Sequence, residues 1–222
     1  MHERAIEVGG QAYCDILRSI TGGLQAKRVL EIGTGWGYSA RAFSESIGIG
    51  GEVVSIDCVR RITNDNLAAI AATGVHFTQI HGKSQVEFAT GPFDILYIDG
   101  DPARAALDFA RFAESVRDGG LIIMDGYGGQ SGPTEAVDNL NVRHPFVTIP
   151  YNLVYSFAIH RKPLPIPQNG RHIAKCEECP QASFSETWSG IDEWADNHVA
   201  TSNHAVALWA EPRHLKYRKK PC

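Results

Sequence analysis

Short apolar runs alternate with longer amphipathic stretches between residues 28 and 160. The short runs are rich in valine and isoleucine, as expected for buried strands, and the longer ones place apolar residues at helical spacing. We predict strands at residues 28–32, 52–56, 75–80, 93–98, 120–124, 145–149 and 153–159, and helices at residues 4–20, 36–47, 62–72, 83–90, 102–117 and 132–142. This alternation is typical of a parallel sheet whose strands are joined by crossover helices.

The helix predicted at residues 102–117 illustrates the periodicity. Pro102 suits its first turn, and Gly119 and Gly120 are expected to end the helix and lead the chain into the next strand. Apolar residues recur every three or four positions, so one face is expected to pack on the sheet. The residues of that face are Ala105, Phe109, Phe112, Ala113 and Val116.

The last two predicted strands are separated only by Pro150, Tyr151 and Asn152. Because parallel strands need a long crossover, this pair is expected to form an antiparallel hairpin at the sheet edge. A nicotinamide-binding Rossmann domain would instead continue as a second βαβαβ half. The pattern therefore predicts an α/β, Rossmann-like sheet of seven strands with helices on both faces and a terminal hairpin.

Composition narrows the class of protein. The chain of 222 residues is 43% hydrophobic, and residues 1–160 hold 12 Lys and Arg against 18 Asp and Glu, which argues against a nucleic-acid-binding surface there. No apolar run approaches the ~18 residues of a membrane helix, and the start MHERAIEVGGQAY lacks the basic-then-apolar pattern of a signal peptide. We expect a cytoplasmic protein without a membrane span.

A proline-rich segment, RKPLPIPQNGRH, follows His160. Prolines at alternate positions suit neither a central strand nor a helix interior, so the segment is expected to be an extended linker. We predict a main domain at residues 1–160, a linker at 161–172, and a small module at 173–222. The basic run HLKYRKK near the end of that module is interpreted as a solvated tail.

A glycine-rich turn follows the first predicted strand. It reads Glu31-Ile32-Gly33-Thr34-Gly35-Trp36-Gly37-Tyr38, with GxGxG spacing, whereas a dinucleotide fingerprint needs a glycine where Tyr38 stands. Glycines let the backbone approach a ligand closely, and the helix N-terminus that follows exposes amide groups. The turn predicts a ligand site at this edge of the sheet.

Acidic residues end or nearly end the first two strands. Glu31 is placed to interact with the ammonium group of an amino-acid cofactor, and Asp57 to accept hydrogen bonds from ribose hydroxyls. Together, the two acids suit a ligand that joins an amino acid to a nucleoside. The alternatives are that Asp57 only caps a turn and that Glu31 is a buried structural acid.

The ordered motifs closely resemble the class I S-adenosylmethionine-dependent methyltransferases over nearly all of residues 1–160. The resemblance rests on VLEIGTGWGYSA at 29–40, VVSID at 53–57, HGKS at 81–84, FDILYIDGD at 93–101 and GGLIIMDGY at 119–127. It implies that Glu31, Gly33, Gly35 and Gly37 surround the methionine part, that Asp57 binds the ribose, and that Gly82, Lys83 and Ser84 line the adenine. We include Thr34, Tyr38, Ser39, Cys58 and Asp99 in the same predicted cofactor site.

The acceptor side resembles the catechol O-methyltransferase-like group and related small-molecule O-methyltransferases. In its metal-dependent members, acids at the ends of strands four and five hold a divalent cation that lowers the pKa of the substrate hydroxyl. Asp99 and Asp125 match those acids and are the candidate Mg²⁺ ligands, but Gly126 stands where a further ligand is usual. The resemblance implies an O-methyltransferase acting on a small molecule.

Without a cation, another group must take the proton of the acceptor. His144 and His160 are the histidines nearest the predicted late strands, and we include His144 with Asp99 and Asp125 as candidate catalytic residues. The alternative is that Asp99 contacts cofactor or substrate, that Asp101 caps the next helix, and that Asp125 stabilises a loop.

The C-terminal module carries a second constellation. Cys176 and Cys179 form a CxxC pair, followed by His198 and His204, in the order of a two-Cys, two-His zinc site, although the central gap is longer than usual. Zinc would supply folding energy to a segment with little core of its own. A CxxC redox pair and incidental cysteines are the alternatives.

A zinc module also suggests a second class of function. The methyltransferase-like domain is then a modifier of a macromolecule recruited by the module, or a non-catalytic scaffold. Residues 176–204 contain acids but no Lys or Arg, which favours a protein partner over nucleic acid. Besides a small-molecule acceptor, we consider such a protein partner and a homodimer.

Overall fold

The computed structural model describes residues 2–87, 89–164, 172–176, 182–185, 197, 206–210 and 214–218, with side chains at 11–87, 89–164 and 197. The chain divides into two compact units, Met1–Pro163 and Leu164–Cys222. Each is described by itself. None of the helices in the described part of the chain is long and apolar enough to cross a membrane.

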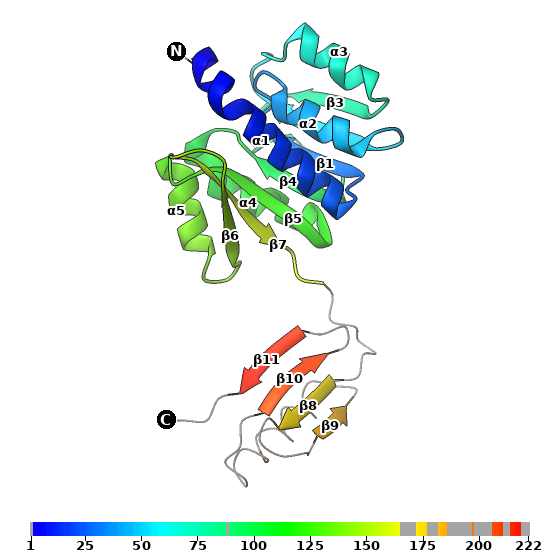
Figure 1. Ribbon diagram of the computed structural model, residues 1–222, viewed down its shortest axis with the longest axis vertical. Coiled ribbons are helices and arrows are strands. Elements are labelled where there is room, and N and C mark those ends of the chain that lie inside the picture. The colour runs from blue at the N-terminus through cyan, green and yellow to red at the C-terminus, as the bar shows by residue number, and fades with distance from the viewer. Residues whose placement is uncertain are drawn as a thin grey trace. The chain divides into compact units, whose positions relative to one another are not determined.

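The first unit is built on a seven-stranded sheet in the order β3-β2-β1-β4-β5-β7-β6 (Figure 1). Strands β1 to β5 are parallel, and β7 runs antiparallel to both β5 and β6. The predicted terminal hairpin is therefore confirmed. The strands are β1 (Arg28–Ile32), β2 (Glu52–Asp57), β3 (His76–His81), β4 (Phe93–Ile98), β5 (Val116–Tyr127), β6 (Phe146–Pro150) and β7 (Ser156–Arg161).

Helices cover both faces of this sheet (Figure 1). One face buries side chains of α1 and α2 with Val29, Ile95 and Tyr97 of the strands, and the other buries Phe109 of α4 with Leu30 and neighbouring residues. Adjacent strand residues point to opposite faces, so both layers draw on the same strands. The helices are α1 (His2–Leu24), α2 (Tyr38–Ile47), α3 (Asn64–Ala72), α4 (Ala105–Phe112) and α5 (Ser131–Leu140), with short 3-10 turns at Pro102–Arg104 and Ala113–Ser115.

Two sequence predictions about these elements were wrong. Residues 83–90 do not form a helix where they are described, and Ser84 and Gln85 instead bond through their side chains to Asp108 of α4. Strand β5 begins at Val116, inside the predicted helix, because Val116 pairs with Phe93 and Arg117 forms an ion pair with Asp94 of β4.

The second unit contains a four-stranded antiparallel sheet in the order β11-β10-β8-β9. The run HLKYRKK was interpreted as a solvated tail, and this is corrected for residues 214–218, which pair with β10. Cys176 ends β8, whereas Cys179, His198 and His204 of the predicted zinc site lie outside the described residues. The strands are β8 (His172–Cys176), β9 (Ala182–Ser185), β10 (Val206–Ala210) and β11 (His214–Arg218).

Candidate functional site

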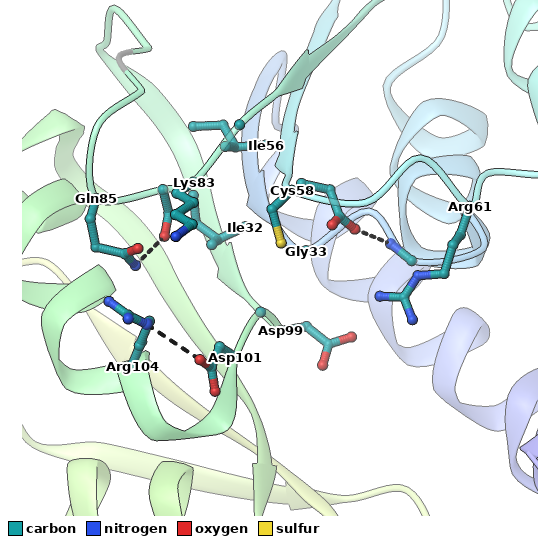
Figure 2. A pocket seen from close by; sticks show the side chains of 15 residues that line it. Ile32, Gly33, Ile56, Cys58, Arg61, Lys83, Gln85, Asp99, Asp101 and Arg104 are labelled. Atoms are coloured by element: carbon teal, nitrogen blue, oxygen red, sulfur yellow. Dashed lines mark hydrogen bonds and ion pairs between the residues drawn. The ribbon is translucent and has the colours of Figure 1, made fainter.

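A cleft of about 410 Å³ lies where strands β1, β2, β3 and β4 end. This is the carboxyl edge of the parallel strands, the usual ligand edge of an open α/β sheet, and the volume is in the range of small-molecule sites. Figure 2 shows the Asp99 side chain directed into the open space of the cleft, with Arg61 and Asp101 on either side.

The glycine turn between β1 and α2 brings the backbone to this cleft. Gly33 has φ +95°, and a Cβ built there would lie 2.2 Å from the carbonyl oxygen of Asp99, so only glycine fits between the two strand ends. Gly35 also lines the cleft, with φ +49° and no atom within 4 Å of the position that a Cβ would take. The turn therefore presents bare backbone to the ligand space.

Asp57, the last residue of β2, holds the turn in place. Its Oδ2 accepts a hydrogen bond from the amide of Gly35 at 2.9 Å, and its Oδ1 accepts one from the amide of Val59 at 2.8 Å. Each carboxylate oxygen keeps a second lone pair for a hydroxyl of a ligand. Asp57 is thus both a cap of the turn and a wall of the cleft.

Glu31 does not line the cleft. It is fully buried beneath the turn, where its carboxylate accepts hydrogen bonds from the hydroxyls of Ser39, at 2.5 Å, and of Ser55, which in turn contacts Thr34. Burial raises the pKa of Glu31 to about 7, although both serine hydroxyls act in the opposite direction. This geometry supports the structural-acid alternative over direct contact with an ammonium group.

The loop after β3 forms the opposite wall. Gly82, Lys83 and Ser84 line the cleft, and the Ser84 hydroxyl donates to Oδ1 of Asp108 at 2.6 Å. Asp108 is almost fully buried on the inner face of α4. The sequence interpretation missed this anchor, although an acid among the apolar positions of an amphipathic helix was the available signal.

The predicted cofactor residues thus separate into two groups. Gly33, Gly35, Asp57, Cys58, Gly82, Lys83, Ser84 and Asp99 line the cleft, whereas Glu31, Thr34, Gly37, Tyr38 and Ser39 do not. The second group builds the turn and the start of α2; Gly37, for example, packs on Ile62. The cleft also contains residues that the sequence did not single out for the cofactor, notably Arg61, Gln85, Asp101 and Arg104.

The two acids proposed for a divalent cation lie near each other but in different environments. Asp99 faces the cleft and is exposed there. Asp125 is buried, and its pKa is raised by burial. Asp101, which is near Asp99 in the sequence, caps the turn at Pro102–Arg104 as the alternative interpretation expected.

The expected Mg²⁺ site is not supported by this geometry. Asp125 accepts hydrogen bonds from Tyr97, Tyr151 and the amide of Gly126, and position 126 has no side chain to add a ligand. Within the described ranges, no group of three His, Cys, Asp or Glu side chains is arranged to hold a metal ion.

The structure does not bring His144 to the cleft. Its ring packs against Phe109 and His160, with centroids 5.1 and 5.2 Å away. His160 pairs with Ile122 of β5, several residues before the carboxyl end of that strand, and its Nδ1 is bonded to the carbonyl of Pro145 at 3.0 Å. Neither His144 nor His160 is among the residues that line the cleft.

Comparison with known proteins agrees with this geometry. Residues 30–127 match the family model described as "Methyltransferase domain". An O-methyltransferase of Aspergillus thermomutatus, AnkF, is 33% identical over 115 residues, which cover 46% of this chain and 44% of the relative. The chain thus matches less than half the length of this curated relative.

Solved structures share the fold at low sequence identity. An O-methyltransferase from Bacillus cereus in complex with SAH is 20% identical with a TM-score of 0.56, covering 71% of this chain and 88% of that one. The O-methyltransferase TomG from Streptomyces achromogenes, in complex with SAM, is also 20% identical with a TM-score of 0.55, covering 68% and 79%. Together with the sheet order, these matches show that the first unit shares its fold with these methyltransferases, and that residues 30–127 are similar to a methyltransferase domain.

Proposed function

We propose that this protein transfers a methyl group from S-adenosylmethionine to a hydroxyl group of a small molecule. The observation that carries the proposal is the bare glycine turn at Gly33 and Gly35 with Asp57 fixed beside it. Gly33 and Gly35 would accept the methionine part, Asp57 the ribose hydroxyls, and the loop at Gly82–Ser84 the adenine. Bound there, the cofactor supplies a methyl group on a sulfonium, which is a good leaving group.

Asp99 is the group we assign to the acceptor. Its side chain faces the cleft, and the Tyr97 hydroxyl lies 3.5 Å from its Oδ2. A carboxylate so placed can accept the proton of an acceptor hydroxyl. Alignment of the two reactants supplies much of the remaining rate.

Binding of S-adenosylhomocysteine tests the cofactor half of the proposal. In calorimetric titrations, Asp57→Ala is expected to weaken binding at least tenfold, about 1.4 kcal/mol, because the variant loses both the ribose acceptor and the anchor of Gly35. The matched control is Asp65→Ala, an exposed acid at the start of α3, which should bind like the native protein. Unchanged affinity in Asp57→Ala would refute the ribose assignment.

The same variants test the catalytic half. With radiolabelled S-adenosylmethionine and a panel of hydroxylated small molecules, Asp99→Asn is expected to lower kcat, whereas Asp57→Ala raises the KM for the cofactor. Binding of S-adenosylhomocysteine without transfer to any acceptor would favour a non-catalytic scaffold recruited through the second unit.

For the second unit we propose a zinc site of Cys176, Cys179, His198 and His204. The proposal is supported by the pairing of Cys176 in β8 with Val206 in β10. In the sequence, Cys179 follows Cys176 by three residues, and His204 precedes Val206 by two. A structural zinc would stabilise this small sheet. The protein partner and the homodimer remain predictions from the sequence.

Metal analysis of the full chain, purified without chelator, is expected to find about one equivalent of zinc. Cys179→Ser should lose most of it because a thiolate ligand is gone. Cys58→Ser, at an exposed cysteine of the first unit, should retain it. Less than about half an equivalent in the native protein would contradict the site.

A further inference from the structure

A cluster of three tyrosines and one aspartate lies behind Asp99 at the ligand edge of the sheet. Tyr97 of β4 donates to Oδ2 of Asp125 on β5 at 3.0 Å, and Tyr151, just after β6, donates to Oδ1 at 2.7 Å. Tyr13 of α1 meets the Tyr97 hydroxyl at 2.5 Å. Because the single proton of Tyr97 goes to Asp125, Tyr13 is the donor in that pair. The tyrosine–aspartate cluster, Tyr13, Tyr97, Asp125 and Tyr151, joins four elements.

Hydrogen-bond donors occupy about three of the four lone-pair positions of the Asp125 carboxylate. Its Oδ1 also accepts from the amide of Gly126 at 2.7 Å, so three donors converge on a side chain with 8% exposure. Mg²⁺ requires near-octahedral oxygen ligands and keeps several waters. A cation at Asp125 would have to displace these donors and find room for its waters within a buried cluster.

Ring packing holds the tyrosine hydroxyls in place. The Tyr13 ring lies 5.5 Å from that of Tyr151 and 5.3 Å from that of Phe157, and Tyr151 lies 4.7 Å from Phe157. Burial and the nearby carboxylates raise the pKa of Tyr13, Tyr97 and Tyr151. The phenols therefore stay protonated at neutral pH and act as donors, not as anionic ligands of a metal.

We propose that the acceptor side of this cleft works without a divalent cation, because the tyrosine–aspartate cluster occupies the carboxylate that the sequence offers as a ligand. The cluster takes over two tasks of a cation: it compensates the charge of Asp125, and it fixes α1 and the β6–β7 hairpin beside the reacting groups. Asp99 is then the carboxylate that meets the acceptor. The inference rests on the proposed function.

Manganese binding tests this without knowledge of the acceptor. The full chain is saturated with S-adenosylhomocysteine, Mn²⁺ is added, and free Mn²⁺ is measured by electron paramagnetic resonance. We expect the native protein and Asp125→Asn to bind the same amount of Mn²⁺ under the same conditions. The comparison covers sites with a Kd below about 1 mM, which is the weak end of protein sites for hard divalent cations. The variant subtracts any Mn²⁺ held elsewhere in the chain.

A difference of about one equivalent between the native protein and Asp125→Asn would overturn the proposal. If Asp125→Asn does not fold, Asp99→Asn replaces it, because Asp99 is exposed and is the second carboxylate that a cation would need. Binding of S-adenosylhomocysteine is recorded in the same samples. Its absence would refute the proposed function, whereas its presence with cation binding would refute this inference alone.

Discussion

Gly33→Ala is expected to lower the affinity for S-adenosylhomocysteine at least a hundredfold, about 2.7 kcal/mol, and to destabilise the first unit by about 3 kcal/mol. The new methyl group would lie 2.2 Å from the carbonyl oxygen of Asp99 and 2.6 Å from its carbon. Both are backbone atoms, so no side-chain rotation relieves the clash, and the ends of β1 and β4 must separate.

Gly35→Ala is the matched control for stability. Gly35 also has a positive φ, +49°, but nothing lies within 4 Å of the added carbon, so only the backbone penalty of about 1 kcal/mol remains. Calorimetry gives the affinities and urea unfolding gives the stabilities. Binding by Gly33→Ala within threefold of the native protein would contradict the assignment of this turn to the cofactor.

Glu31→Gln is expected to raise the free energy of unfolding by about 3 kcal/mol at pH 8 relative to its effect at pH 4.5. The pKa of Glu31 in the folded state, about 7, exceeds the ordinary value of 4.5. The folded protein therefore holds this proton more tightly, and stability is lost as pH rises from about 4.5 to 7. Glutamine carries no charge, so the variant escapes that loss.

Urea unfolding at the two pH values gives the free energy of unfolding of the native protein and of Glu31→Gln. The difference between the two proteins removes the contribution of groups that titrate in both. Glu114→Gln is the control, because the side chain of Glu114 is 91% exposed and its contribution to the pH dependence should be small. An effect of Glu31→Gln that is equal at pH 4.5 and pH 8 would show that Glu31 is not held as a protonated buried acid.

The sequence was most informative where one repeating pattern decides the structure. Valine- and isoleucine-rich runs predicted both ends of β1 and β4 to the residue. The hairpin was predicted because only the short segment from Pro150 to Asn152 separates the last two predicted strands. The predicted helix at 83–90 failed because side-chain bonds from Ser84 and Gln85 to Asp108, distant in sequence, replace helical ones. Tertiary contacts of this kind override local propensity.

The placement of site residues divides in the same way. Residues at the ends of parallel strands, such as Asp57 and Asp99, are brought to one edge by topology alone, and both line the cleft. His144 follows α5, and because a crossover helix returns the chain to the opposite edge, nearness in sequence to the late strands was misleading.

The sequence by itself determined the succession of strands and crossover helices along the chain, because this depends on periodicity. It also determined the glycine turn, because that turn depends on positions where a side chain cannot fit. Only the tertiary structure decided that Glu31 is buried beneath the turn and that Asp125 is enclosed by tyrosines. Their environments are assembled from elements far apart in the chain, with Tyr13 and Tyr97 separated by 84 positions. The accessibility and protonation of a carboxylate depend on such neighbours, which no local pattern specifies.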